Sequence, residues 1–151
     1  MLLTWNCIFF DELSNKDLYR ILQLRSEVFV LEQQCLYQDM DNKDFRSWHL
    51  MGLDEKGDLA AYARLLPPGI SYDEPSIGRV ISSPACRRTG AGKELMKMAL
   101  EKCVELFGQE AIKIGAQLYL KKFYESFGFE ISGPVYLEDD IEHVEMIRNL
   151  Q

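Results

Sequence analysis

One stretch near the middle of this 151-residue chain constrains the fold more than any other. A short apolar run that ends at Ser82 is followed by the turn Arg87-Arg88-Thr89-Gly90-Ala91-Gly92, after which apolar residues recur at helical spacing as far as Phe107. This pattern predicts a strand over Ser76–Ser82 and a helix from about Thr89 to Gly108. A strand that leads through a tight turn into a long amphipathic helix is typical of mixed α/β domains.

The rest of the chain alternates strand-like and helix-like runs without internal repeats. We predict strands over Trp5–Glu12, Trp48–Leu53, Leu59–Leu65, Ala111–Gly115, Phe129–Gly133 (with an extension toward Leu137) and His143–Leu150, and helices over Lys16–Gln33, capped by Ser14 or Asn15, and Leu118–Phe127. The acidic segment Gln34–Arg46 is expected to be an ordered loop. The expected fold is therefore one mixed α/β (α+β) domain over residues 1–151, in which helices flank a mixed central sheet of six to seven strands.

Charge and cysteine usage exclude several classes of function. The formal net charge is −7, which argues against nucleic acid or an anionic membrane as the main partner. The four cysteines form no CxxC pair, the start of the chain lacks the features of a signal peptide, and no apolar run is long enough to span a membrane. The two histidines, His49 and His143, are too far apart to form a metal motif. We therefore expect a reduced, cytoplasmic protein without a metal.

The basic turn before the second long helix indicates an anion site, because free N–H groups at a helix start bind phosphates and glycine allows close approach. A Walker loop would need glycine in place of Arg87 and Ser or Thr in place of Glu94. A dinucleotide-binding fingerprint would need a third glycine at Leu95. The remaining pattern is Arg87-x-x-Gly90-x-Gly92, and the alternative is a helix that is simply capped by a tight turn.

With this pattern, the chain resembles the GNAT family of acetyl-CoA-dependent N-acyltransferases. The segment Phe123-Tyr124-Glu125-Ser126-Phe127-Gly128-Phe129 is similar to the downstream Tyr-x-x-x-Gly-Phe motif of that family, and the order of elements fits over nearly the whole chain. The runs Leu24–Cys35 and Tyr37–Asp41, together with Arg64-Leu65 and Gly78-Arg79-Val80, are similar to the ElaA-like branch. The resemblance implies a single GNAT-like domain over residues 1–151.

The resemblance also implies where acetyl-CoA, the co-substrate, would bind. The main chain of Val80, Ile81 and Ser82 would pair with the pantetheine arm, and the N–H groups from Arg88 to Lys93 would hold the pyrophosphate. Arg87 and Arg88 would add charge-assisted contacts or else remain solvated at the surface. The implied cofactor-binding residues are Val80, Ile81, Ser82, Arg87, Arg88, Thr89, Gly90, Ala91, Gly92, Lys93 and Gln117, the last of which replaces an asparagine frequent in the family.

By the same resemblance, Tyr124 is the group that assists the departing thiolate. An unperturbed tyrosine has a pKa of about 10 and a thiol one of about 8.5, so full proton transfer would be unfavourable by roughly 2 kcal/mol. Tyr124 is therefore expected to stabilise the thiolate by hydrogen bonding. The alternative is an interior aromatic residue on a short amphipathic helix.

Two charged residues of the first helix, Arg25 and Glu32, fall on the same side as Val28 and Phe29 at 100° per residue. Charges on an apolar stripe must be paired or must face a pocket. Either both make structural hydrogen bonds, or Glu32 receives a proton from an amine directly or through water. The second interpretation makes Glu32 a candidate catalytic residue, because an amine with a pKa near 10.4 is mostly protonated at pH 7.

The expected reaction is transfer of an acetyl group to a primary amine by direct attack in a ternary complex. A transferase with a longer acyl group or a non-amine acceptor, and a non-catalytic CoA-binding or regulatory module, are the alternatives. Arg64 and Arg79 either line the acceptor cleft or pair with acidic residues, and His143 is a secondary candidate for contact with the acceptor.

The charge distribution bears on the partners. Residues 87–122 carry eight basic and four acidic residues, whereas the other 115 residues have a net charge of −11. The acidic residues of Asp39–Asp44 and Glu138–Glu142 either favour a cationic acceptor or simply belong to solvated loops. We prefer the second interpretation. The partner would be a small-molecule or peptide amine, and the resemblance is compatible with a homodimer.

Overall fold

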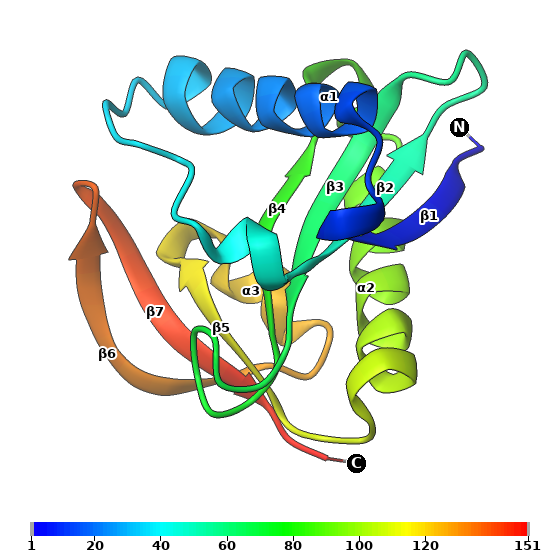
Figure 1. The fold of residues 1–151 in the computed structure, drawn as a ribbon. Coiled ribbons are helices and arrows are strands. Elements are labelled where there is room, and N and C mark those ends of the chain that lie inside the picture. The colour runs from blue at the N-terminus through cyan, green and yellow to red at the C-terminus, as the bar shows by residue number, and fades with distance from the viewer. Residues whose placement is uncertain (1, 151) are drawn as a thin grey trace.

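The computed structural model describes residues 2–150, which form seven strands and three α-helices (Figure 1). In chain order these are β1 (Thr4–Phe9), α1 (Asn15–Arg25), which continues as a π-helical segment (Ser26–Glu32), β2 (Trp48–Leu53), β3 (Leu59–Leu66), β4 (Ser76–Ser82), α2 (Ala91–Phe107), β5 (Ile112–Gln117), α3 (Lys121–Glu125), β6 (Glu130–Glu138) and β7 (Ile141–Arg148). The order confirms the predicted mixed α/β fold.

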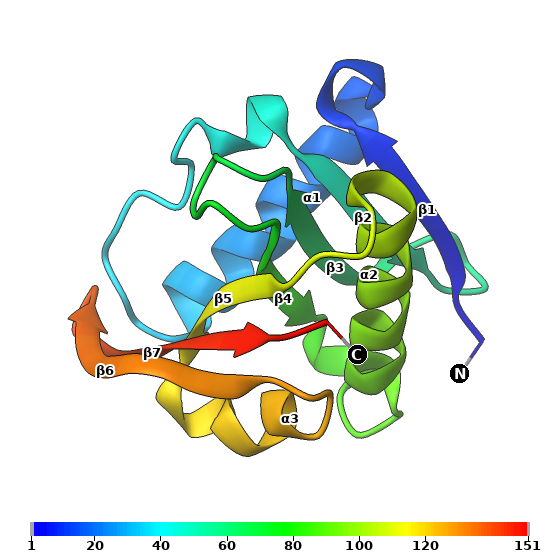
Figure 2. The same ribbon diagram turned by 90° about the horizontal axis from the view of Figure 1, so that it is seen from below.

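The seven strands are divided between two antiparallel sheets. One has the order β1-β2-β3-β4 and the other the order β5-β7-β6. The sheets meet where β4 and β5 begin, because the N–H of Lys113 donates to the carbonyl of Pro75 at 3.1 Å. From there the two strands diverge toward their C-terminal ends (Figures 1 and 2). The number of strands agrees with the predicted six to seven, but the strands form two sheets, separated between β4 and β5, in place of one central sheet.

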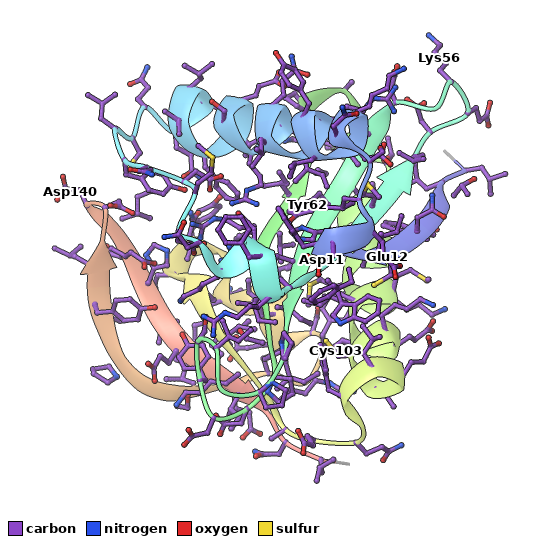
Figure 3. All side chains as sticks on the ribbon, in the orientation of Figure 1. Asp11, Glu12, Lys56, Tyr62, Cys103 and Asp140 are labelled. Carbon is purple, nitrogen blue, oxygen red and sulfur yellow. The ribbon has the colours of Figure 1, made fainter. Side chains whose placement is uncertain are left out.

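Helices cover both faces of the four-stranded sheet, with α1 on one face and α2 on the other (Figures 1 and 2). Strand β3 is consequently buried from Ala60 to Leu66. Its residue Tyr62 belongs to the apolar cluster under α1, whereas Cys103 belongs to the cluster around α2 (Figure 3). The three-stranded sheet adds Ile114, Val144 and Met146 to the α2 cluster, which ties the two sheets together.

The first helix confirms one prediction and corrects another. Of the two predicted caps, Ser14 is the one that caps the helix, with its Oγ accepting from the N–H of Asp17 at 3.0 Å. The helix then widens into a π-helical turn, whose longer hydrogen-bond step reduces the rotation per residue. Arg25 is fully buried as expected, but the side chain of Glu32 is 40 % exposed. The assignment of Glu32 to the buried side was wrong because it assumed a regular α-helix.

Other boundaries differ by a few residues. Strand β1 ends at Phe9 in a 3-10 turn over Phe10–Glu12, and the predicted helix Leu118–Phe127 is a 3-10 turn (Leu118–Leu120) followed by the short α3. Strand β6 extends to Glu138, one residue beyond Leu137, the longer of the two limits expected. None of the helices described within residues 2–150 combines the length and the hydrophobicity of a transmembrane span.

Candidate functional site

The principal cavity, with a volume of about 920 Å³, lies where the two sheets diverge. Its walls include Gly78–Ser82 of β4, the residues Ile114, Gly115 and Gln117 of β5, and the end of the π-helical turn. The lining contains these residues of the predicted site: Glu32, Val80, Ile81, Ser82, Arg87, Gly92, Gln117 and Tyr124. The other predicted cofactor residues lie outside this lining: Arg88, Thr89 and Gly90 in the adjoining turn, and Ala91 and Lys93 in the first turn of α2.

A β-bulge shapes the wall that β4 contributes. Arg64 of β3 pairs with Gly78, and Tyr62 pairs with Ile81, so β4 has one residue more than β3 over this stretch. Arg79 adopts a left-handed conformation with φ 49° inside the bulge. A bulge leaves an extra residue outside the ladder and bends the strand. The backbone at Arg79 and Val80 is therefore released from regular pairing on the cavity wall, and β4 turns away from β5.

The turn before α2 forms the second feature of the cavity. Gly90 is the N-cap of α2 with φ 87°, and it provides no side chain to bond the N–H groups of the first turn. Arg88 is also left-handed, with φ 65°, while the hydroxyl of Thr89 donates to the carbonyl of Cys86. Unpaired N–H groups and the positive end of the helix dipole favour an anion at this position.

Two predicted cofactor residues contact the π-helical turn across the mouth of the cavity. Arg87 donates through both terminal nitrogens to Glu32, at 2.9 and 2.6 Å. Gln117 and Gln33 exchange two hydrogen bonds at 3.3 and 3.4 Å. The carboxylate proposed to accept a proton and the arginine proposed to bind phosphate are thus paired with each other, a relation that helical spacing alone did not reveal.

Tyr124 of α3 is nearly buried, with 6 % of its surface exposed, and lines the cavity. Its ring packs edge-on against Phe123 and Phe129, with centroids 5.3 and 6.0 Å away. Burial raises the pKa of the Tyr124 hydroxyl, so the group stays protonated at neutral pH and can donate a hydrogen bond.

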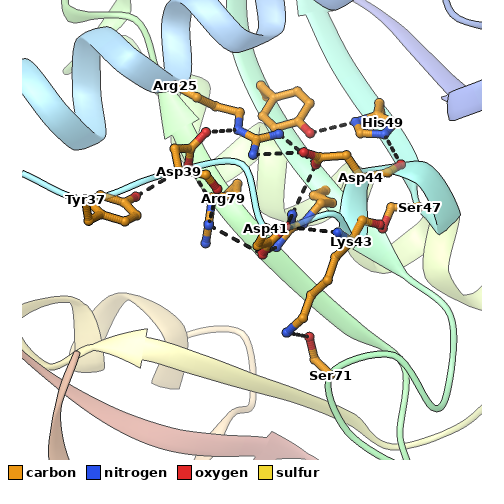
Figure 4. A network of polar contacts seen from close by, with 12 residues as sticks. Arg25, Tyr37, Asp39, Asp41, Lys43, Asp44, Ser47, His49, Ser71 and Arg79 are labelled. Carbon is orange, nitrogen blue, oxygen red and sulfur yellow. Dashed lines mark hydrogen bonds and ion pairs between the residues drawn. The ribbon is translucent and has the colours of Figure 1, made fainter. Parts of the chain in front are cut away.

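A network of buried ion pairs around Arg25 supports the cavity wall formed by the acidic loop and by strands β3 and β4 (Figure 4). Arg25 donates from Nε to Asp39 at 2.7 Å and from Nη1 to Asp44 at 2.8 Å. Both aspartates are more than nine-tenths buried. The preferred interpretation of this loop as solvated was therefore wrong, because its carboxylates turn inward to neutralise a helix arginine.

Arg64 and Arg79 extend the network into the cavity. Arg64 donates to Asp41 at 2.8 and 2.9 Å, and Arg79 donates from Nε to Asp39 at 2.7 Å. Burial opposes ionisation of Asp41, but the hydrogen bonds and charge of Arg64 outweigh it and lower the pKa of that carboxyl to about 2. Both alternatives expected for these arginines are present, since each pairs with acids and lines the cavity.

The face of β5, β7 and β6 forms the remaining wall, which sequence reasoning left largely unassigned. His143 lies next to Tyr136 in the register of β6 and β7, and the two rings stack with centroids 5.6 Å apart. A Cβ at Gly115 would lie 2.7 Å from the hydroxyl of Tyr136 and 3.1 Å from that of Tyr72. Glycine at this position thus allows two tyrosine hydroxyls to approach β5.

The cavity therefore has chemically different walls. The wall near α2 presents backbone N–H groups, Arg87 and Tyr124, whereas the other walls present His143 and the charged side chains of Asp41, Arg64 and Arg79. Such a site suits a ligand that carries an anionic group at one end and reacts near the middle. Among residues 2–150, no group of three or more His, Cys, Asp or Glu side chains is arranged to hold a metal.

Comparisons with known proteins agree over nearly the whole chain. Residues 11–150 match the family described as acetyltransferase (GNAT) domain. A UPF0039 protein of Synechocystis sp. is 42 % identical, with 97 % of this chain and 96 % of that protein covered.

Two similar proteins also have solved structures. A crystal structure of an acyl-CoA N-acyltransferase from Pseudomonas aeruginosa has a TM-score of 0.91 at 43 % identity, and the similarity covers 97 % of this chain and 99 % of that one. The crystal structure of Escherichia coli ElaA has a TM-score of 0.91 at 40 % identity, with 98 % and 100 % covered. The fold described above is shared with both.

Proposed function

This chain belongs to the GNAT family of acetyltransferases, and we propose that it transfers an acetyl group from acetyl-CoA to a primary amine. The observation that carries the proposal is the divergence of β4 and β5 beside the uncapped start of α2. This arrangement combines a backbone-lined slot with a phosphate-binding helix end. Family membership supports an acyl-CoA as the donor, while the acetyl group and the amine are part of the proposal.

The residues around α2 fit the anionic part of CoA. The N–H groups from Arg88 to Lys93 would hold the pyrophosphate, since Gly90 leaves them without a side-chain cap. At Gly92 the nearest atom to an added Cβ is Phe123 Cζ at 4.0 Å, so the backbone there is open to close approach. Arg87 would contribute charge once it exchanges Glu32 for a phosphate oxygen.

The bulge of β4 supports the chemical step. Val80, Ile81 and Ser82 line the cavity, and their main chain would pair with the pantetheine arm. An N–H group in this region would polarise the thioester carbonyl while the amine attacks it. A C–N bond forms and the C–S bond breaks, so that negative charge develops on sulfur.

Tyr124 would donate a hydrogen bond to that sulfur. Because burial raises its pKa, complete transfer of the Tyr124 proton to a thiolate is more unfavourable than for a tyrosine in water. The hydroxyl therefore stabilises the leaving group by a hydrogen bond, and solvent supplies the final proton.

Glu32 is the proton acceptor proposed from the sequence. In the structure both of its carboxylate oxygens are bonded by Arg87. To receive a proton from the amine, Glu32 would first have to separate from that guanidinium.

The test is an assay of thiol release with acetyl-CoA and a panel of amines. We expect Tyr124→Phe to lower turnover while it leaves the affinity for CoA unchanged, and the control Tyr19→Phe, on the exposed side of α1, to have no effect. Saturating acetyl-CoA should raise the melting temperature of the wild type. Failure of acetyl-CoA to bind would refute the proposal, and binding without transfer to any amine would favour the non-catalytic CoA-binding module.

A further inference from the structure

We propose that His143 is the group that takes the proton from the acceptor amine, with Glu138 as its positioning residue. This inference rests on the proposed function and assigns a step that the paired carboxylate of Glu32 does not readily perform. It follows from the position of the imidazole ring, from the hydrogen bond that fixes its tautomer, and from the carboxylate beside it.

The ring lies inside the cavity at the level of the predicted cofactor contact. His143 of β7 pairs with Gln117 of β5 on one side and with Tyr136 of β6 on the other. Its side chain is only 9 % exposed, and the cavity lining includes it. Stacking on the Tyr136 ring fixes the orientation of the imidazole plane. His143 is thus an ionisable group that the cavity shields from bulk water.

One hydrogen bond determines which ring nitrogen is free. Nδ1 of His143 lies 2.8 Å from the carbonyl oxygen of Ile141, which can only accept. Nδ1 therefore carries the hydrogen, and in the neutral ring Nε2 keeps its lone pair. An attacking amine must lose a proton as its new bond forms, and a bare imidazole nitrogen can receive it.

A carboxylate lies on the side of that free nitrogen. Oε2 of Glu138 is 3.5 Å from Nε2 of His143, and Glu138 also lines the cavity. Once Nε2 is protonated, the new N–H has an acceptor within reach and the imidazolium charge has an opposite charge beside it. Glu138 would act only through His143, by orienting the ring and stabilising its charged form.

The other histidine serves as an internal comparison. Nδ1 of His49 lies 2.7 Å from the hydroxyl of Tyr62, and its Nε2 lies 3.1 Å from the carbonyl of Asp44. Both nitrogens are therefore used, and the ring is fully buried away from the cavity. Of the two histidines, His143 alone is placed to exchange a proton with a ligand.

The step balances without a further reactant. The amine nitrogen forms a bond to the carbonyl carbon, its proton passes to Nε2 of His143, and the electron pair of the C–S bond leaves with sulfur. The imidazolium then releases its proton to water, while the thiolate receives one from water. The ring is thereby returned to its starting form.

The main test compares steady-state kinetics of wild type and His143→Asn. The amide nitrogen of asparagine can replace Nδ1 as donor to the Ile141 carbonyl, but it offers no base in place of Nε2. We expect kcat to fall at least about 100-fold, with KM for acetyl-CoA and the melting temperature almost unchanged. Free imidazole should restore part of the kcat of His143→Ala without raising its melting temperature.

Further variants separate His143 from its neighbours. Glu138→Gln should lower kcat by about 10-fold, because the imidazolium loses a charged acceptor. Glu142→Gln, which changes an exposed carboxylate of β7, should leave kcat unchanged. Nitrogen-15 NMR of the unliganded protein should detect the tautomer with hydrogen on Nδ1 when the His143 ring is neutral. This measurement does not depend on activity.

The outcomes are distinct from those of the proposed function. If wild type acetylates an amine but His143→Asn keeps most of its kcat, or if hydrogen resides on Nε2 in the neutral ring, the assignment is wrong. A much larger loss in Glu32→Gln than in His143→Asn would assign the proton to Glu32. If wild type transfers to no amine while it binds CoA, the proposed function itself fails.

Discussion

Replacing Arg25 with methionine tests whether the buried ion network stabilises the fold. Methionine keeps an unbranched apolar chain in the helix but removes the cation between Asp39 and Asp44. Removing one partner of a buried ion pair costs about 3–5 kcal/mol. Each aspartate keeps a second arginine, at 2.7 Å from Arg79 and 3.1 Å from Arg64, so we expect a cost near the lower value, about 3 kcal/mol.

The loss can be measured by urea unfolding and calorimetry. For a domain of this size, about 3 kcal/mol corresponds to a decrease in melting temperature of about 6–12 °C. The control is Arg20→Met in the same helix, whose nearest carboxylate is the partly exposed Asp17 at 4.0 Å and which should lose about 1 kcal/mol or less.

A double variant tests the pairing itself. Asp44→Asn removes the carboxylate that faces Arg25, so Arg25→Met combined with Asp44→Asn should cost less than the sum of the two single changes. A cost for Arg25→Met no larger than that for Arg20→Met, or strict additivity in the double variant, would refute the reasoning.

Three further predictions concern stability. Burial lowers the pKa of His49, whereas an unfolded histidine takes up a proton near pH 6.5. The unfolding free energy should therefore fall as pH decreases below about 6.5. The urea midpoint should be lower at pH 5 than at pH 7.5, and the difference should be smaller in His49→Gln. Ser14→Ala removes the cap bond to Asp17 and should cost about 1 kcal/mol, or about 2–4 °C by calorimetry; an unchanged melting temperature would contradict it. Gly115→Ala should cost about 1–3 kcal/mol in urea unfolding, because its Cβ would lie 2.7 Å from a tyrosine hydroxyl, whereas Gly78→Ala, 3.8 Å from its nearest neighbour, should be tolerated; equal costs would contradict this.

The elements that sequence reasoning located well are those with strong local signals. The strand–turn–helix from Ser76 to Phe107 was predicted almost to the residue, because apolar periodicity and the glycines of the turn determine it locally. Ser14 was one of two adjacent candidates for the helix cap for the same reason. The order of strands and helices was predicted from the same kind of pattern, and it agreed with the order in the GNAT family.

Features that depend on backbone geometry or on distant partners were not predicted. The π-helical turn that exposes Glu32 and the bulge at Arg79 have no simple compositional signature. The partners of Arg25 lie 14 and 19 residues away, in a loop whose acids looked like ordinary surface residues. A buried-stripe arginine followed by three nearby aspartates was a usable signal, and it could have identified this pairing.

The part of the cavity that we propose to bind CoA was inferred from motif residues, but the wall formed by β5, β7 and β6 was not. His143 was only a secondary candidate, because its importance depends on a hydrogen bond to Ile141 and on the register of β6, β7 and β5. Gly115 drew no attention because its neighbours, two tyrosines, come from distant segments. No local pattern in a single sequence shows that residues from such distant segments lie side by side in the fold.

The separation of the strands into two ladders has a consequence for local opening of the native protein. Segments that share few backbone hydrogen bonds can open as separate cooperative units, each with its own free energy. Amide hydrogen exchange should then reveal two groups of protected amides, with β3, buried on both faces, the slowest and the outer strand β6 among the fastest. A ligand that contacts both β4 and β5 would stabilise both units at once, so exchange should slow even in strands that the ligand does not touch.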